Sequence, residues 1–295
     1  MSFNSRMHVF IGIDPFRHVR RKMTVHEIKN RGSRLVFDSI GAYVKSLSLS
    51  GVDILMETPD GEQTHGGAAL LIPYANRVRN ASYTWNGKEY YLPKNNGQHS
   101  IHGLTRALDW VVLTESDETV LSTDIRHEGY PDGVKVKVRM LLNTDSFEVS
   151  MDFQNSGELP VPLSPGMHPY FIFKERWQIR AYEEIKMLEY ADEYFPDGNL
   201  IKTGADLLSS DSGKVLDNCF IMGNRLTLML GTHSINVETH NMPYFVVYNG
   251  KYSAGKSVAV EPMVAPPDAF NNHIGLVTVS PGEHFSCNAK FELAR

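Results

Sequence analysis

The sequence predicts an all-β fold, a large antiparallel β-sandwich that forms one domain over residues 1–295. Residues 134–139 and 147–153 alternate apolar with polar side chains, which is the period of two that half-buried antiparallel strands show. Other short apolar segments are separated by Gly, Asn and Pro, without a strand–helix–strand rhythm or an internal repeat. Because no Pro/Ser-rich break divides the chain, we expect one domain.

The first third of the chain reads as short strands. Three β-branched or alternating segments, separated by Gly-containing turns, cover residues 23–28, 34–38 and 42–49. The apolar run 66–73 then leads into Asn76 and Arg77, a polar pair that predicts a strand ending at a rim. Asn86-Gly87, flanked by aromatic residues, is the preferred two-residue turn of a hairpin over residues 85–92.

The second half continues in the same style, with one ambiguous stretch. Residues 182–194 fit a helix by composition and short strands equally well. Strands are expected at 226–230, 235–237, 244–248 and 258–260, and two more are expected around Pro281-Gly282 between residues 274 and 293.

Composition describes an ordinary globular protein, with 42% hydrophobic and 21% charged residues. A formal charge of −5 gives no basic footprint, so neither nucleic acid nor a membrane is an expected partner. No segment has the pattern of a signal peptide or the length of a membrane span. Cys219 and Cys287 are therefore expected to be reduced thiols in a cytoplasmic protein, which is either a monomer or a homodimer.

Residues 163–171 concentrate chemical groups, and His168 is the candidate catalytic residue among them. The neighbouring prolines predict that its ring is presented from a stiff loop or a strand edge. Tyr170 and Phe171 are expected to form one wall of a pocket. The alternative is a strand whose histidine is hydrogen-bonded within the core.

Glu261 follows an apolar strand and precedes a proline, an unusual place for a carboxylate. It is either half of a structural ion pair or a desolvated general base with a raised pKa. A His and a Glu together could transfer protons at a carbonyl or an acetal, one donating while the other accepts.

Metal binding is a rival use of the same atoms, through His99, His102, His168 and Glu261. A spacing of three would point His99 and His102 to opposite faces of a strand, so acid–base work ranks first and no metal is expected. The sequence has no phosphate-binding glycine loop, no G-x-S-x-G and no HExxH motif. Arg77, Arg79 and Arg106 could bind a phosphate ester or lie at the surface.

Several motifs together resemble the galactose mutarotase, or aldose 1-epimerase, family. They follow the family's order between Gly66 and Asn272: residues 74–78, 85–92, 101–103, 167–171, 216–220, 260–262 and 267–271. The resemblance implies a β-sandwich with an open sugar cleft, a small-molecule sugar as the partner, and interconversion of the α and β anomers of an aldohexose such as galactose without a cofactor.

The resemblance also implies roles for individual residues. Glu261 is similar to the base that takes the C1 hydroxyl proton, and His168 to the acid that protonates the ring oxygen. His102 resembles a second catalytic histidine near that oxygen. Arg77 resembles the arginine that orients the sugar, and Asn76 and Asp217 resemble groups that hold its hydroxyls.

Departures from the family pattern concern the substrate more than the chemistry. Pro73-Tyr74 stands where a Gly-Arg is usual, and His102-Gly103-Leu104 where a His-Gly-Gly is usual. Arg106 resembles the phosphate-holding arginines of hexose-6-phosphate mutarotases, but their Gly-Ile/Val-Pro strand is absent. The expected function is therefore an aldose 1-epimerase for a neutral sugar, the alternatives being a hexose-6-phosphate mutarotase and a carbohydrate-binding protein without activity.

Overall fold

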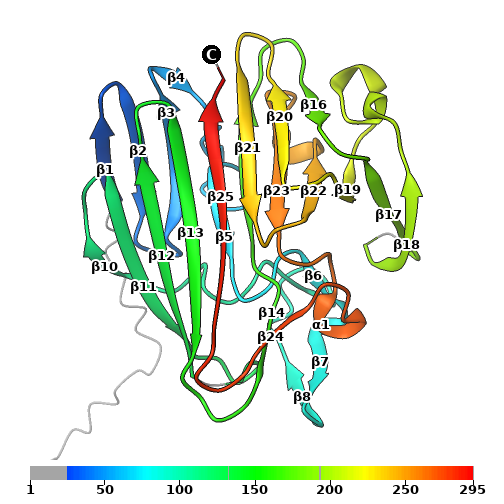
Figure 1. Ribbon diagram of the computed structural model, residues 1–295. Helices are drawn as coiled ribbons and strands as arrows, with labels where there is room; N and C mark the ends of the chain where they lie inside the picture. The colour runs from blue at the N-terminus through cyan, green and yellow to red at the C-terminus, as the bar shows by residue number, and fades with distance from the viewer. Residues whose placement is uncertain (1–24, 132, 193, 295) are drawn as a thin grey trace, which may run out of the picture.

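A computed structural model describes residues 25–131, 133–192 and 194–294. Two large antiparallel sheets dominate it, and Figure 1 shows the long strands of one passing in front of the other. The all-β sandwich predicted from the sequence is therefore confirmed. Within the described residues, no helix has the length and hydropathy needed to span a bilayer.

The larger sheet has eleven strands, and its central strands carry His168 and Glu261. From edge to edge it runs β1 (Val25–Asn30), β2 (Ser33–Asp38), β3 (Tyr43–Leu49), β5 (Ala68–Leu71), β15 (Gly166–Ile172), β23 (Ser257–Met263), β22 (Tyr244–Tyr248), β19 (Asp217–Ile221), β17 (Lys186–Tyr190) and β18 (Pro196–Lys202), with β4 (Val52–Asp53) paired to β3.

The second sheet has eight strands and contains both segments of alternating apolar and polar residues, 134–139 and 147–153. Its order is β10 (Val111–Thr114), β11 (Glu118–Ile125), β12 (Val134–Leu142), β13 (Ser146–Asn155), β25 (His284–Leu293), β21 (Ser234–His240), β20 (Arg225–Met229) and β16 (Gln178–Ala181). In β12 the valines are buried and the lysines between them are exposed, as the period of two predicts.

Small elements complete the fold, and most of them surround one end of the sandwich (Figure 1). Three two-stranded ladders are present: β6 (Arg77–Val78) with β9 (Ser100–Ile101), β7 (Ser82–Trp85) with β8 (Lys88–Tyr91), and β14 (Val161–Leu163) with β24 (Val277–Val279). The β7–β8 pair is the hairpin predicted at Asn86-Gly87. In the described part of the chain, the helical turns are α1 (Ala269–Asn272), η1 (Arg79–Ala81), η2 (Ala205–Leu207), η3 (Ser210–Ser212) and η4 (Lys251–Ser253).

Apolar side chains from both sheets form the core. Phe171 of β15 contacts Phe291 of β25 edge to face, with ring centroids 5.3 Å apart. Phe171 thus faces the core between the sheets, and the prediction that it forms a pocket wall is wrong. The reason is the strand's alternation, which sends Tyr170 and Phe171 to opposite faces. Both cysteines, Cys219 and Cys287, are buried and unbridged.

For residues 182–194 the helix alternative is wrong. β17 occupies Lys186–Tyr190, where Met187 pairs with Ile201 of β18 and with Phe220 of β19. Backbone groups on both sides of this segment are bonded in the sheet, which outweighs a weak helical composition. The strand predicted over residues 23–28 begins at Val25, and residues 23 and 24 lie outside the described part of the chain.

Candidate active site

His168 and Glu261 lie on neighbouring central strands, β15 and β23. Gly166 pairs with Met263 and Tyr170 with Ala259, so counting two residues inward from each pair places His168 opposite Glu261. Their side chains meet, with 3.3 Å between Nε2 of His168 and Oε1 of Glu261. Two residues 93 positions apart in the chain therefore form an acid–base pair on one face of the sheet.

The prediction that His168 sits on a loop or a strand edge is wrong, because β15 lies between β5 and β23. Proline in an inner strand removes one ladder hydrogen bond. Between β15 and β23, pairs are described at Gly166 and again from Tyr170 onward, but not at the three positions from Met167 to Pro169. Pro169, which has no backbone N–H to donate, lies within this gap. The stiff backbone that the prolines suggested is therefore supplied by sheet pairing on the β5 side, where Pro169 lies opposite Ala68.

Burial shifts the pKa of both members of the pair. Glu261 is 2% exposed and His168 is 5% exposed. Burial raises the pKa of Glu261 well above its ordinary value, the charge of Asp217 adds to this, and Arg77 opposes it. Burial lowers the pKa of His168 to about 3. Both shifts disfavour the charged forms, as expected where apolar neighbours such as Ala69 and Val246 share the same face.

His102, the residue directly after β9, approaches the pair. Its ring meets that of His168 edge to face, with centroids 5.2 Å apart. Burial lowers its pKa well below the ordinary value, with the His168 charge as the next cause. His102 has a φ of 64°, and the next residue, Gly103, has a φ of 75°. A Cβ at Gly103 would lie 2.2 Å from the Ile72 carbonyl O, so only glycine fits after this histidine.

Arg77 is fixed at the same site by a group of polar side chains. Its Nε donates to Oδ1 of Asn96 at 3.1 Å, and its Nη1 donates to Oδ1 of Asn76 at 3.3 Å. Nη1 also lies 3.9 Å from Oδ2 of Asp217, and the guanidinium stacks 4.1 Å from the centre of the Tyr194 ring. Arg77 therefore supplies a fixed positive charge to the cavity that Glu261 also lines.

One cavity of about 600 Å³ joins these groups. All six residues predicted for the site line it: Glu261, His168, His102, Arg77, Asn76 and Asp217. Among the described residues that line this cavity, Oε2 of Glu261, Nδ1 of His102 and Nδ1 of His168 are buried without a hydrogen-bond partner. Buried polar atoms that lack partners are uncommon in proteins, so this group suits a polar ligand that would supply them.

The structure adds wall residues that sequence reasoning missed. Tyr248 and Tyr252 form part of the wall, as do His65 and Asn96, and the ring of His65 stacks on Tyr252 at 3.5 Å between centroids.

Tyr170 lines the cavity as predicted, stacks on His168 with ring centroids 4.8 Å apart, and donates a hydrogen bond from its hydroxyl to the Thr64 carbonyl O. Arg106 also lines the cavity, whereas Arg79 pairs with Asp192 outside it.

The donor set of the metal alternative is not assembled. His99 accepts a hydrogen bond from the Asn80 backbone N–H and packs on Phe195, away from the cavity that holds the other three residues. Within the described part of the chain, no group of three or more His, Cys, Asp and Glu side chains is placed to hold a metal ion.

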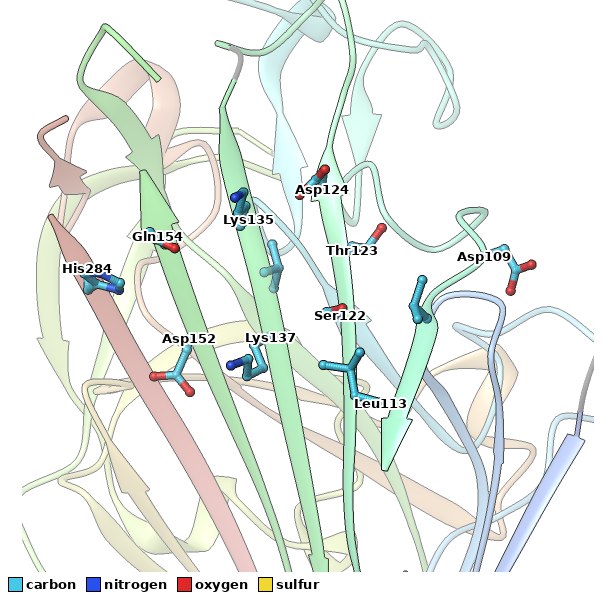
Figure 2. Close-up of a pocket in the computed structure, with 12 residues that line it drawn as sticks. Asp109, Leu113, Ser122, Thr123, Asp124, Lys135, Lys137, Asp152, Gln154 and His284 are labelled. Atoms are coloured by element: carbon cyan, nitrogen blue, oxygen red, sulfur yellow. The ribbon is translucent and has the colours of Figure 1, made fainter. Parts of the chain in front are cut away.

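A second hollow, of about 720 Å³, lies on the outer surface of the eight-stranded sheet (Figure 2). Lys135, Lys137 and Asp152 stand along adjacent strands there, and His284 pairs across the ladder with Gln154 instead of a carboxylate. These side chains are exposed and form no counterpart of the His168–Glu261 pair. Size alone therefore does not identify the reactive site.

Glu261→Gln is expected to stabilise the fold, and the gain is expected to grow with pH. In the unfolded chain Glu261 ionises near its ordinary pKa, whereas the folded protein holds the proton to higher pH. The stability of the parent protein therefore falls as pH rises from that ordinary value to the raised one, by about 1.4 kcal/mol per pH unit. Glutamine carries no such penalty.

Urea unfolding of the parent and the variant at pH 5 and pH 8 measures this effect. Glu158→Gln is a matched control, because Glu158 is exposed. A stability difference for Glu261→Gln that is the same at both pH values would contradict the raised pKa.

Comparison with known proteins identifies the class to which this fold and cavity belong. The sequence profile of the aldose 1-epimerase family matches residues 24–292, so the chain belongs to that family. Uncharacterized protein YihR of Escherichia coli K12 is 29% identical over 266 residues, which cover 83% of this chain and 85% of that protein. Galactose mutarotase of Sus scrofa is 36% identical over 145 residues, which cover 46% of this chain and 41% of that protein.

Solved structures show the same fold. The GalM/aldose epimerase homologue from C. elegans superposes with a TM-score of 0.78 at 19% identity, covering 93% of this chain and 99% of that one. The family resemblance seen in the sequence motifs is thereby confirmed, together with the architecture that it implied.

Proposed function

We propose that this protein is an aldose 1-epimerase that interconverts the α and β anomers of an aldohexose. The observation that carries the proposal is the buried His168–Glu261 pair, 3.3 Å apart, at a cavity large enough for a hexose. Family membership supports an isomerase that acts on sugars. Galactose is a reasonable first sugar, because one relative is a galactose mutarotase.

The proposed reaction needs one proton to leave the sugar and another to enter it. Glu261 takes the proton of the C1 hydroxyl while His168 gives a proton to the ring oxygen. The bond between C1 and the ring oxygen then breaks, and C1 becomes an aldehyde carbon. Rotation about the C1–C2 bond followed by the reverse transfers closes the ring on the other face. Each group returns to its starting state, so the chemistry requires no cofactor.

The buried pair must hold one proton for this chemistry. Burial favours that proton on Glu261, whereas the proposed donor form has it on His168 and leaves a carboxylate beside Arg77. These two arrangements contain the same number of protons, so their ratio does not change with pH. The pH profile should therefore follow the one-proton state of the pair as a whole, and activity should fall as pH rises through the raised pKa of Glu261.

Other cavity residues have supporting roles in the proposal. His102 lies against His168 and is expected to contact the region of the ring oxygen. Arg77 is expected to orient the sugar and to favour the ionised form of Glu261. Asn76 and Asp217 offer an amide and a carboxylate to sugar hydroxyls.

Polarimetry of freshly dissolved α-D-galactose and α-D-glucose tests the activity. The proposal predicts that the optical rotation relaxes faster in proportion to protein concentration, above the spontaneous rate. A protein that binds these sugars in calorimetry but leaves the rate spontaneous would be a carbohydrate-binding protein without this activity.

A hexose-6-phosphate mutarotase is a second candidate, favoured by the position of Arg106. Its guanidinium lines the cavity, and Nε is fixed by donating to the His102 carbonyl O at 3.1 Å. A guanidinium fork suits a phosphate group. Glu62 lines the same cavity, and its negative charge acts on Arg106. Because this charge offsets part of the positive charge that would attract a phosphate, a neutral sugar remains the first candidate substrate.

Arg106→Gln separates the two substrates. If the substrate is a 6-phosphate, the variant should lose about 10- to 100-fold in kcat/KM for that sugar, the value of a lost charge-assisted contact of about 1.5–3 kcal/mol. The same variant should change kcat/KM for neutral hexoses much less. An equal loss with glucose and glucose 6-phosphate, measured side by side, would contradict a phosphate-binding role.

A further inference from the structure

Asp268 lies in the 267–271 motif, to which the proposed reaction assigns no role. It does not line the cavity, yet it contacts the segment that carries Arg77. Its backbone N–H donates to the Arg77 carbonyl O at 2.8 Å. Its Oδ1 accepts from the backbone N–H of Arg79, also at 2.8 Å. One residue therefore bonds both ends of the three-residue segment 77–79.

That segment has little other sheet support. β6 has two residues, and its described ladder is with β9 alone, where Arg77 pairs with Ile101 and Val78 with Ser100. A two-stranded ladder of this length is weak in isolation. Ala81, two residues beyond the segment, has a φ of 52°, a left-handed conformation that alanine rarely adopts and that its surroundings must therefore hold. The position of the Arg77 backbone, to which the side chain is attached, therefore depends on additional hydrogen bonds to this segment.

Asp268 is itself firmly held. It is buried, and its Oδ1 also accepts from Nδ2 of Asn271 at 2.8 Å. Nδ2 of Asn271 donates in addition to the Ser82 carbonyl O at 3.1 Å. The neighbouring Phe270 packs against Tyr74 with ring centroids 5.3 Å apart, just before the Asn76–Arg77 pair. Figure 1 shows α1 beside β6 and β7, where these contacts are made.

Asp268 also belongs to the run of chain that carries the proposed base. It follows Glu261 by seven residues and lies five residues beyond Met263, the last residue of β23. The bonds from Asp268 to the main chain at 77 and 79 thus connect the strand of Glu261 to the strand of Arg77. Arg77 is the positive group that opposes the upward shift of the Glu261 pKa.

We propose that Asp268 is a positioning residue, which holds the Arg77 main chain so that the guanidinium lies beside Glu261. Its effect on turnover rests on the proposed mutarotase function, but its effect on the carboxyl of Glu261 does not. Oδ1 of Asp268 accepts from the Arg79 backbone N–H, while Oδ2 lies 3.6 Å from Nε of the Arg79 side chain. The neutral Asp268→Asn variant therefore keeps the main-chain acceptor and loses only the ion pair.

The test compares Asp268→Ala with Asp268→Asn in the full chain. Carbon NMR titration of the Glu261 carboxyl, assigned by its loss in Glu261→Gln, reads the effect directly. Asp268→Ala should raise the pKa of Glu261 further and lower kcat/KM about 10- to 100-fold, the size expected from displacing a substrate-orienting group by about 1 Å. Asp268→Asn keeps an acceptor and should restore most of both.

Two further variants keep the test decisive. Asn272→Ala removes side-chain hydrogen bonds to Pro267 and Ile274 from the same short helix without touching the 77–79 segment, and should leave the pKa of Glu261 unchanged. If Asp268→Ala does not fold, Asn271→Ala frees one side of the carboxylate and should shift that pKa in the same direction by less.

A double-variant cycle identifies the route of the effect. In an Arg77→Gln background, Asp268→Ala should add no further shift, because the guanidinium through which it acts is gone. An unchanged pKa of Glu261 in the single variant, or a fully additive shift in the double variant, would overturn the proposal. A parent protein that fails to accelerate mutarotation would refute the proposed function, while the titration would still decide the role of Asp268.

Discussion

Glu261→Gln is expected to lower the turnover of mutarotation about 10²- to 10⁴-fold, the usual contribution of one general acid or base. The glutamine side chain keeps the size of the carboxyl group and can still hydrogen-bond a sugar hydroxyl, but it cannot accept the C1 proton as a base. Sugar binding should therefore persist while kcat falls. Polarimetry at matched protein concentrations, with the spontaneous rate subtracted, measures the loss.

Asp152→Asn is the matched control for this change. Asp152 stands on the outer face of the eight-stranded sheet (Figure 2), so the control removes a carboxylate far from the proposed chemistry. Turnover in the control should equal that of the parent. Parent-like turnover in Glu261→Gln would rule out Glu261 as the base.

His168→Ala is expected to lower turnover by a similar factor of about 10²–10⁴, because the ring oxygen loses its proton donor. The effect should not add to that of Glu261→Gln, since the two groups transfer protons in one concerted unit. Anomer exchange measured by NMR in the two single variants and the double variant gives all three values.

His284→Ala serves as the control for a lost imidazole, since His284 is exposed on the outer sheet (Figure 2). The double variant should lose about as much as either single variant. A loss in the double variant equal to the product of the two single losses would show that His168 and Glu261 act independently, against the proposed mechanism.

The strands could be predicted from the sequence because their signals are local. The valine–lysine alternation of β12 and the Asn86-Gly87 turn each specify their own structure within a few residues. The facing of His168 and Glu261 has no such signal, because it depends on the register of two strands that meet only in the folded sheet. The expectation that His168 and Glu261 act together came from the family resemblance, and the structure places their side chains 3.3 Å apart.

Local reasoning was wrong where tertiary context decides. Pro169 suggested a strand edge, yet β15 lies inside the sheet, between β5 and β23. The sheet can hold this proline because the ladder between β15 and β23 has a gap at its position. The cavity walls contributed by His65, Asn96 and Tyr252 come from loops and a short helical turn. Their sequence is merely polar or aromatic, so nothing in its spacing indicated that these segments meet at the cavity.

Magnetisation transfer between the α and β C1 protons tests most directly whether the His168–Glu261 pair catalyses anomer exchange. The measurement covers D-galactose, D-glucose and their 6-phosphates at equilibrium, with parent protein and with the Glu261→Gln, His168→Ala double variant. We expect exchange of at least one sugar to rise in proportion to parent concentration, and the double variant to bind that sugar with exchange lowered at least about 10²-fold. Exchange at the spontaneous rate for every sugar that the parent binds, or undiminished exchange in the double variant, would contradict the account.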